Sequence, residues 1–314
     1  MTSSEATVHV VGSGIVARRL RRLLHARHVA EVDPRRAQIP NAINGDLAIL
    51  AQGCDHAEMA AELIERGVHV VTVGDGLDDT RALFELDAQA VASHTSLVIG
   101  AALSPGLSEL IARHLANQLH EVDEIHVAMH GTSGPSCALM HHRSLSRRSV
   151  GWHDGEWADY LGGSGRELCW FPEPVGAKDC YRAQIPSPVL LHHSFPEVSR
   201  ISARRSARRR DRLTARLPML VRPHQQGGIG ALRVEVRGND ASGGRQCLIA
   251  GVAELVGSAA AATAAAFATM TLDGKLPVGV VIAGDQLLPT IELLRNVQSF
   301  GVRLQEFTGV PQPG

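Results

Sequence analysis

A short apolar run that ends in two spaced glycines constrains this chain more than any other stretch. The segment Val8–Ala17 reads VHVVGSGIVA, and a helical pattern follows it. This order is the G-x-G-x-x-A form of the strand–turn–helix fingerprint of dinucleotide-binding domains. Gly12 permits a sharp turn, Gly14 lets the backbone approach a pyrophosphate, and Ala17 lets the helix pack closely on the strand. The free N–H groups at the helix start then face the anion.

An acidic residue follows this turn at the distance expected for a contact to the adenosine ribose. Glu31 lies 19 residues after Gly12, in a second apolar run. A carboxylate there favours NAD, because it would repel the 2′-phosphate of NADP. Arg35 and Arg36 are close enough in sequence to bind that phosphate, so NADP stays open. The predicted cofactor contacts of this first region are Gly12, Ser13, Gly14, Ile15, Val16, Glu31, Asp33 and Arg35.

Short apolar runs and helical patterns alternate through residues 1–120. Several runs are continuous, which is typical of parallel strands covered on both faces, so we expect a Rossmann-like α/β domain. The link 33–46 contains two prolines and is barely long enough for a crossover, so we expect no full helix in it. The predicted strands are Thr7–Val11, Val29–Val32, Leu47–Leu50, Val68–Val73 and Leu97–Gly100. The predicted helices are Ile15–Ala26, His56–Arg66, Asp79–Ala92 and Gly106–Leu119.

The composition of the sequence changes after residue 120. Seven of the eleven aromatic residues fall between Trp152 and Phe195. A strand is predicted at residues 123–129, followed by a tight turn and a helix with Pro135 at its first position. One hairpin is predicted through residues 150–157, with Trp152 opposite Trp157, and another joins 229–237 to 245–253. We therefore expect a second, α+β domain with a mainly antiparallel sheet.

Residues 97–108 read LVIGAALSPGLS, and with the preceding strands they resemble the G-x-G-x-x-P-G-L-S turn of saccharopine dehydrogenase-like NAD(P)-binding reductases. The resemblance is strong over residues 7–118 and loose afterwards, and Ala102 stands where the family usually has glycine. Ser104 is a natural N-cap for a helix opened by Pro105 and Gly106.

The resemblance also implies a division of the chain and a second set of cofactor contacts. It places the NAD(P)-binding domain at 1–121, a substrate-binding and dimerisation domain at 122–285, and the segment 286–314 back on the first domain. Three strand-end loops would flank the nicotinamide. Their predicted cofactor contacts are Ala51, Gln52, Gly53, Gly74, Ala101 and Ala102.

Two neighbouring groups of polar residues could handle a substrate. The loop HGTSGPS at 130–136 offers hydroxyls and backbone N–H groups at a helix start, which suits a carboxylate. A histidine has a pKa suited to proton transfer. The candidate proton donors are His130, His141 and His142. The predicted substrate contacts are Ser104, Thr132, Ser133, Gly134, Ser136 and Arg143.

These features predict an NAD(P)-dependent oxidoreductase acting on CH–NH or C=N bonds. As in the group it resembles, it would reduce an imine of an amino- or keto-acid substrate, or run the reverse oxidation. A carbonyl or semialdehyde reductase of homoserine dehydrogenase-like type stays open, although Lys178 is the only lysine of the second domain before its C-terminal helices. A non-catalytic NAD(P)-sensing protein is the third hypothesis.

Composition and charge argue against several other classes of protein. The net charge is −1, which gives no sign of a nucleic-acid or membrane partner. The longest small-apolar run, Ala259–Met270, is too short to span a bilayer. Five cysteines without a C-x-x-C pair, and no visible secretory signal, lead us to expect a cytoplasmic protein. No spacing of histidines predicts a metal site.

Eight arginines lie within seventeen residues, from Arg200 to Arg216. We interpret this run as the solvated face of a helix with some domain or subunit contacts. An antiparallel sheet leaves one face free, so we expect a homodimer formed through that face.

Overall fold

The computed structural model describes residues 7–24, 28–32, 46–53, 55–219 and 222–307, and the observations below concern these residues. Contacts divide the chain into two compact units. Unit 1 comprises Met1–Leu107 and Gly257–Gly301, and unit 2 comprises Ser108–Val256 and Val302–Gly314. No described helix is both long enough and apolar enough to cross a membrane.

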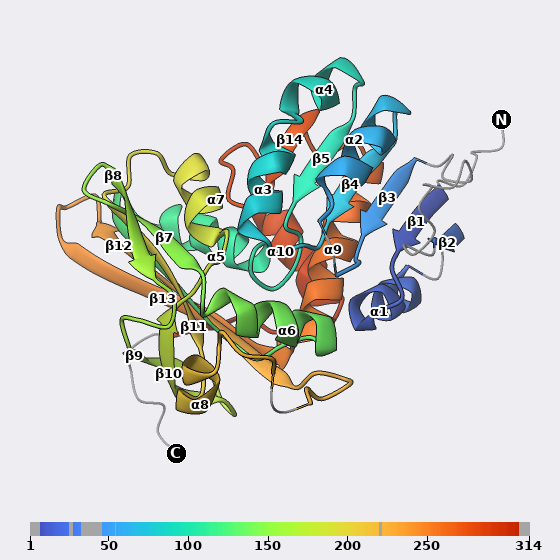
Figure 1. Ribbon diagram of the computed structural model, residues 1–314. Helices are drawn as coiled ribbons and strands as arrows, with labels where there is room; N and C mark the ends of the chain where they lie inside the picture. Colours follow the sequence, from blue (N-terminus) through green and yellow to red (C-terminus); the bar gives the residue numbers. More distant parts are fainter. Residues whose placement is uncertain (1–6, 25–27, 33–45, 54, 220–221, 308–314) are drawn as a thin grey trace. The chain divides into compact units, whose positions relative to one another are not determined.

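Unit 1 is built on a six-stranded sheet in the order β14-β5-β4-β3-β1-β2, and every strand pair in it is parallel (Figure 1). The side chains of β3 and β5 are buried throughout, as expected for continuous apolar runs in a covered sheet. The strands are β1 (Thr7–Val11), β2 (His28–Val32), β3 (Leu47–Leu50), β4 (His69–Thr72), β5 (Ser96–Ile99) and β14 (Gly279–Ile282).

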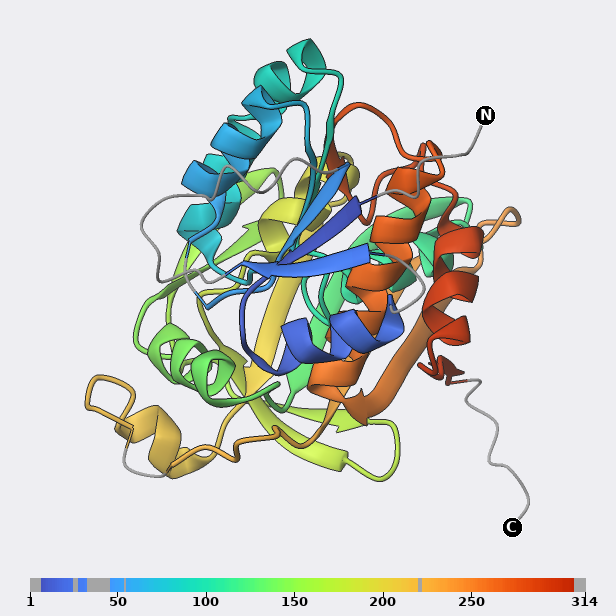
Figure 2. The ribbon, with the colours of Figure 1, turned by 90° about the vertical axis from the view of Figure 1, so that its right-hand side faces the viewer.

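Helices lie on both sides of this sheet, and Figure 2 shows α2 and α3 on one side and α9 and α10 on the other. The alanines of α9 are almost entirely buried, and Gly257 lies so close to Ile15 that a Cβ would approach it to 2.9 Å. The small side chains thus allow α9 to pack closely on α1. The helices are α1 (Ile15–Leu23), α2 (Ala57–Glu65), α3 (Leu77–Phe84), α4 (Asp87–Ala92), α9 (Val256–Leu272) and α10 (Thr290–Ser299).

Unit 2 contains a nine-stranded, mainly antiparallel sheet in the order β15-β13-β12-β6-β11-β10-β9, with β7 and β8 attached beside β11. The central strand β6 is parallel to β11 and antiparallel to β12. The strands are β6 (Glu121–His130), β7 (Arg148–His153), β8 (Glu156–Leu161), β9 (Glu167–Phe171), β10 (Gly176–Arg182), β11 (Arg200–Ser206), β12 (Ile229–Asn239), β13 (Arg245–Leu255) and β15 (Gln305–Glu306).

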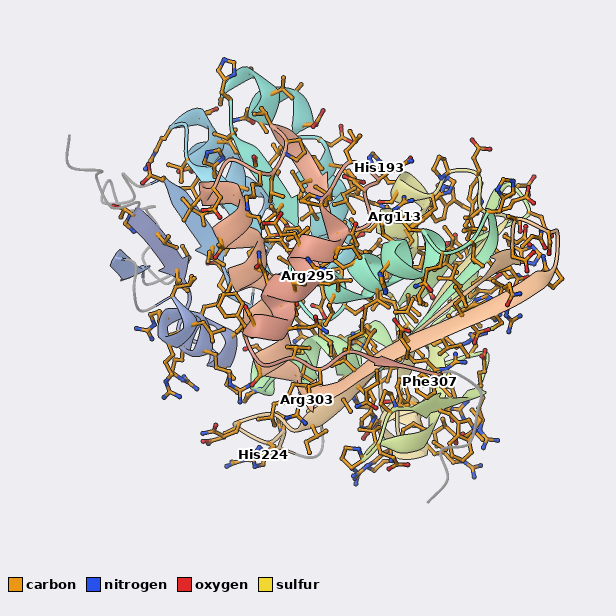
Figure 3. The ribbon with its side chains drawn as sticks, turned by 180° about the vertical axis from the view of Figure 1, so that it is seen from behind. Arg113, His193, His224, Arg295, Arg303 and Phe307 are labelled. Carbon is orange, nitrogen blue, oxygen red and sulfur yellow. The ribbon has the colours of Figure 1, made fainter. Side chains whose placement is uncertain are left out.

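Four helices belong to this part of the chain: α5 (Leu107–Ala116), α6 (Pro135–Ser144), α7 (Ser187–Ser194) and α8 (Arg209–Leu213). Arg113 of α5 donates to the Ser194 carbonyl at 2.8 Å, and its guanidinium lies 3.9 Å from the centre of the Phe195 ring. Figure 3 shows Arg113 near His193 of α7. These contacts join α5 to α7.

The sheet forks beside β11, because two different strands pair with the two halves of β11 on the same side. Its first half pairs with β7, where Arg200 is opposite His153, and its second half pairs with β10, where Arg204 is opposite Arg182. Strand β9 then packs back across β6 and β12, since Phe171 lies in one buried cluster with Ala128 and Ala231. The free sheet face expected from the sequence is therefore partly covered by the sheet's own edge.

Most predicted elements agree with the structure, including the five first strands, and Trp152 does lie opposite Trp157. The predicted helix 79–92 is wrong in detail, because the chain turns at Leu86 and forms two helices. A hydrogen bond from Leu107 N–H to the Ala102 carbonyl, at 3.0 Å, closes the turn before α5, where Ser104 is the predicted cap.

The arginine run from Arg200 is mostly strand β11 rather than a helix face, and only α8 within it is helical. The division of the chain also differs from the predicted boundaries 121 and 286. Strand β14 pairs with β5, which brings the chain into unit 1 from Gly257 onward. Strand β15 pairs with β13, so residues 302–307 belong to unit 2.

Candidate active site

The predicted cofactor turn lies directly after β1, in unit 1. Gly12 has a φ of +131°, and a Cβ there would lie 2.8 Å from the Ala51 carbonyl oxygen. Gly14 precedes α1, no side chain caps the helix, and nothing described lies within 4 Å of the position of a Cβ. The first N–H groups of α1, from Ile15 and Val16, therefore have no acceptor of the helix's own. This is a cradle into which a phosphate group fits.

The order of the sheet places this turn where ligands bind in open α/β folds. Strand β1 lies between β2 and β3, so the connection after β1 leads to one side of it and the connection after β2 leads to the other. Ligands of open α/β folds bind where the strand order reverses in this way. A hydrogen bond of 2.9 Å from Ala51 N–H to the Val11 carbonyl joins the ends of β1 and β3. Glu31 pairs with Val10, one residue before the end of β2, so its backbone lies at the same edge. Asp33 and Arg35 lie outside the described residues.

A buried histidine that the sequence did not single out fixes the loops that follow β3 and β4. Asp79 accepts the N–H of His56 at 2.8 Å and that of Ala57 at 3.0 Å, which caps α2. The ring Nε2 of His56 donates to the Gln52 carbonyl at 3.2 Å. A Cβ on Gly74 would lie 2.9 Å from Nδ1 of the same ring. His56 thus holds the predicted cofactor residues Gln52 and Gly74 in one place.

Burial controls the charge of this histidine. His56 has no exposed surface, and desolvation lowers its pKa below 6.5, although the nearby Asp79 carboxylate opposes the shift. The ring is therefore neutral at physiological pH. A neutral ring can donate from Nε2 while presenting an unprotonated Nδ1 to the backbone at Gly74.

The last loop of this edge follows β5. Thr72 binds it from β4, because its Oγ1 accepts the Gly100 N–H at 3.0 Å and its carbonyl accepts the Ala101 N–H at 2.6 Å. Gly106 has a φ of +120°, and a Cβ there would lie 2.5 Å from the Gly100 carbonyl oxygen, so the turn requires glycine. Ala101, Ala102 and Ser104 are all buried within this turn. The parallel sheet thus brings the predicted cofactor loops of unit 1 to one edge.

The predicted carboxylate loop lies in unit 2, between β6 and α6. Gly134 precedes α6 without a side-chain cap, and Ser136 is exposed in the first turn, as is Arg143 farther along the helix. A second glycine segment supports the loop, since a Cβ on Gly227 would lie 2.5 Å from the Thr132 carbonyl oxygen. Ser133 is half-buried beside it, at 2.7 Å from the same position. The sequence signal for this support is the GGIG stretch at 227–230.

The three candidate histidines lie in different surroundings. The Nε2 of His142 donates to the carbonyls of Thr214 and Leu217, both at 3.1 Å, so this buried side chain fixes a loop. His141 is also buried, with Nε2 at 3.2 Å from the Sγ of Cys137 on the same helix. Of the two, His141 is the better candidate for proton transfer.

His130 lies on the other face of the sheet from α6. The neighbouring Met129 contacts Arg205, which reaches Ser144 of α6, and successive strand residues point to opposite faces. The Nδ1 of His130 is 2.6 Å from the Ser206 Oγ. Burial, aided by nearby cationic side chains, lowers its pKa below 6.5. His130 and His141 therefore cannot serve the same substrate.

No protein-family model and no curated protein matches the sequence. Among solved structures, the apo saccharopine dehydrogenase (L-Glu forming) of Saccharomyces cerevisiae is similar at 12% identity and a TM-score of 0.70, covering 96% of this chain and 100% of that one. A mutant meso-dapdh with DAP from Clostridium tetani has 14% identity, a TM-score of 0.48 and coverage of 92% and 96%. The amine dehydrogenase of Mycobacterium smegmatis has 12% identity, a TM-score of 0.47 and coverage of 90% and 96%. The first similarity shows that this chain has the fold of saccharopine dehydrogenase.

Proposed function

We propose that the protein is an NAD(P)-dependent oxidoreductase that reduces a C=N bond of an amino- or keto-acid substrate, or oxidises the corresponding amine. The observation that carries the proposal is the cradle at Gly12 and Gly14, surrounded at one sheet edge by the loops after β3, β4 and β5. When bound, the nicotinamide would supply or accept the hydride. NAD is favoured over NADP by Glu31 at the end of β2.

The substrate would be bound by residues of unit 2. The N–H groups and hydroxyls at Thr132, Ser133 and Ser136 suit a carboxylate, and the exposed Arg143 adds positive charge on the same helix. His141 would hold the proton exchanged with the substrate nitrogen. The ring of His142, by contrast, is bound to two backbone carbonyls, those of Thr214 and Leu217.

A turnover assay tests the proposal. The purified protein is mixed with NADH or NADPH and a set of 2-oxo acids, with and without ammonia or primary amines, and loss of the reduced cofactor is recorded. We expect turnover only when an amine and an oxo acid are both present. Loss of NADH with an aldehyde or oxo acid alone would support a carbonyl reductase instead. Tight cofactor binding without any turnover would identify a sensor.

Glu31→Ala gives the test of cofactor preference. Removing the carboxylate is expected to weaken NADH binding by about tenfold, the value of one or two hydrogen bonds to a charged group, and to leave NADPH binding unchanged or improved. If the parent protein binds NADPH more tightly and the substitution changes neither affinity, the assignment of Glu31 is wrong.

A further inference from the structure

We propose that unit 2 carries a second binding site, for a small oxyanion with two or more negative charges, held by Arg182 and Arg204. The site lies in the fork of the sheet, where β7 and β10 diverge along β11. We call this cavity of about 360 Å³ the fork pocket. It is separate from the loop and helix to which the substrate is assigned. The lining residues that matter here are Trp152, Tyr160, Glu167, Arg182, Arg204 and Glu235.

The two central arginines are direct cross-strand neighbours. Arg182 on β10 is paired in register with Arg204 on β11, and both line the pocket. Residues opposite each other on adjacent antiparallel strands have Cβ atoms roughly 5 Å apart, and like charges in this arrangement are destabilising. An anion between the two guanidinium groups would remove that repulsion. The pairing is therefore more favourable with a ligand than without one.

The surrounding carboxylates of the described chain satisfy Arg204 only in part and Arg182 not at all. The Nε of Arg204 donates to Glu167 at 2.6 Å, but its Nη1 is buried and has no hydrogen-bond partner within the described ranges. The guanidinium of Arg182 lies 3.8 Å from the centre of the Tyr160 ring. No carboxylate of the described chain is within salt-bridge distance of Arg182. Buried N–H donors without acceptors are costly, and an oxyanion supplies acceptors.

The other charged groups of the pocket do not cancel its positive charge. Glu235 is 2.5 Å from both Arg233 and Arg237, and although burial opposes it, these two arginines hold the pKa of Glu235 below 4.5. The five lining arginines are opposed by two lining glutamates and by Glu124, which pairs with Arg237 at 3.2 Å and with Arg200 at 3.9 Å beside the pocket, so two positive charges remain. The net excess of positive charge favours a ligand with at least two negative charges over a monovalent anion.

Aromatic contacts support one wall of the pocket. Trp152 of β7 is stacked on His192 of α7, with ring centroids 3.8 Å apart, and makes an edge contact with Trp157 at 5.2 Å. Tyr160 is fixed under Arg182. A preformed cavity of this volume is within the range of small-ligand sites, roughly 300–1,000 Å³. Phosphate esters, pyrophosphate and polycarboxylates share the required chemistry.

Calorimetric titration of the full chain tests the proposal, with pyrophosphate and citrate as separate probes and acetate as the monovalent control, all at one ionic strength. We expect saturable binding of pyrophosphate or citrate, and the stronger of the two identifies the ligand class. Arg204→Gln and Arg182→Gln should each weaken that binding by about tenfold, the value of a hydrogen bond to a charged group. Arg148→Gln, which removes an exposed β7 arginine paired with Asp159, should leave it unchanged.

Thermal unfolding without added anion supplies an independent readout. Because the two arginines repel each other, Arg204→Gln and Arg182→Gln should unfold at the parent's temperature or above it, and pyrophosphate or citrate should raise the melting temperature of the parent alone. Absence of saturable binding, or equal binding by Arg204→Gln, would overturn the proposal. A loss of dimer in Arg204→Gln without any effect on anion binding would show an interface instead. NADH affinity, measured on the same variants, should not change, which separates this site from the proposed function.

Discussion

At the scale of single residues, the glycine turn after β1 was predictable from the sequence, but the side chains that hold its surroundings were not. Gly12 was predictable because its φ of +131° and the Ala51 carbonyl oxygen, 2.8 Å from a Cβ there, exclude other residues. Gly14 followed from the spacing of the fingerprint, since nothing described lies within 4 Å of a Cβ there. His56 and Asp79 were not, since their interaction depends on two loops that meet only in the folded sheet. His142 was predicted to transfer a proton, whereas its Nε2 binds two backbone carbonyls. A histidine's role depends on contacts that sequence spacing does not encode.

The two neighbouring histidines of α6 should respond differently to substitution. His141→Gln is expected to lower kcat by about 100-fold, as for loss of a general acid, with little change in melting temperature. His142→Gln should lower the melting temperature, because the Thr214 and Leu217 carbonyls lose their buried donor. Steady-state kinetics and thermal unfolding of both variants check this. Equal loss of kcat with unchanged stability in both would contradict the assignment.

The lowered pKa of His56 predicts a pH dependence of stability. The unfolded chain binds a proton near pH 6.5 while the folded ring stays neutral, so the free energy of unfolding should fall as the pH drops below about 6.5. His56→Gln should flatten this dependence, whatever its effect on stability at neutral pH. Unfolding curves between pH 7 and 5 provide the measurement. An unchanged slope in the variant would show that His56 is protonated in the folded protein.

At the scale of elements, periodicity predicted the parallel strands and both antiparallel hairpins, because their apolar patterns are unbroken. It failed at β11, where arginines at 200, 204 and 205 suggested a helix face. These side chains alternate between the two faces of a strand, and Arg205 is buried while its neighbours are half-buried. Arginines that are held by carboxylates and aromatic rings within the sheet do not follow the simple pattern of buried and exposed residues.

The support of the carboxylate loop gives a prediction at this scale. Gly227→Ala places a Cβ 2.5 Å from the Thr132 carbonyl oxygen at a φ of +68°, so the loop must move. We expect KM for the substrate to rise by about tenfold, with NADH affinity unchanged. Gly243→Ala is the matched control, because its φ is +83° and nothing lies within 4 Å. A similar KM for both variants would show that this loop does not bind the substrate.

At the scale of the whole molecule, the two-domain α/β and α+β organisation was predictable from the change in composition, and the fold is that of saccharopine dehydrogenase. The domain boundaries were harder to predict from the sequence, because β14 and β15 are short segments that join different units. A homodimer remains a prediction. Light scattering should then give twice the chain mass of 33.5 kDa, and a monomeric mass would exclude it.

The central claim is that the turn after β1 binds a dinucleotide. Fluorescence titration with NADH and NADPH tests it most directly in the parent, Gly12→Ala and Gly67→Ala. Gly67 is the control for backbone strain, because its φ is +73° and nothing lies within 4 Å of a Cβ there. We expect saturable binding by the parent and Gly67→Ala, and at least about tenfold weaker binding by Gly12→Ala. Failure of the parent to bind either nucleotide, or equal binding by Gly12→Ala, would contradict the account.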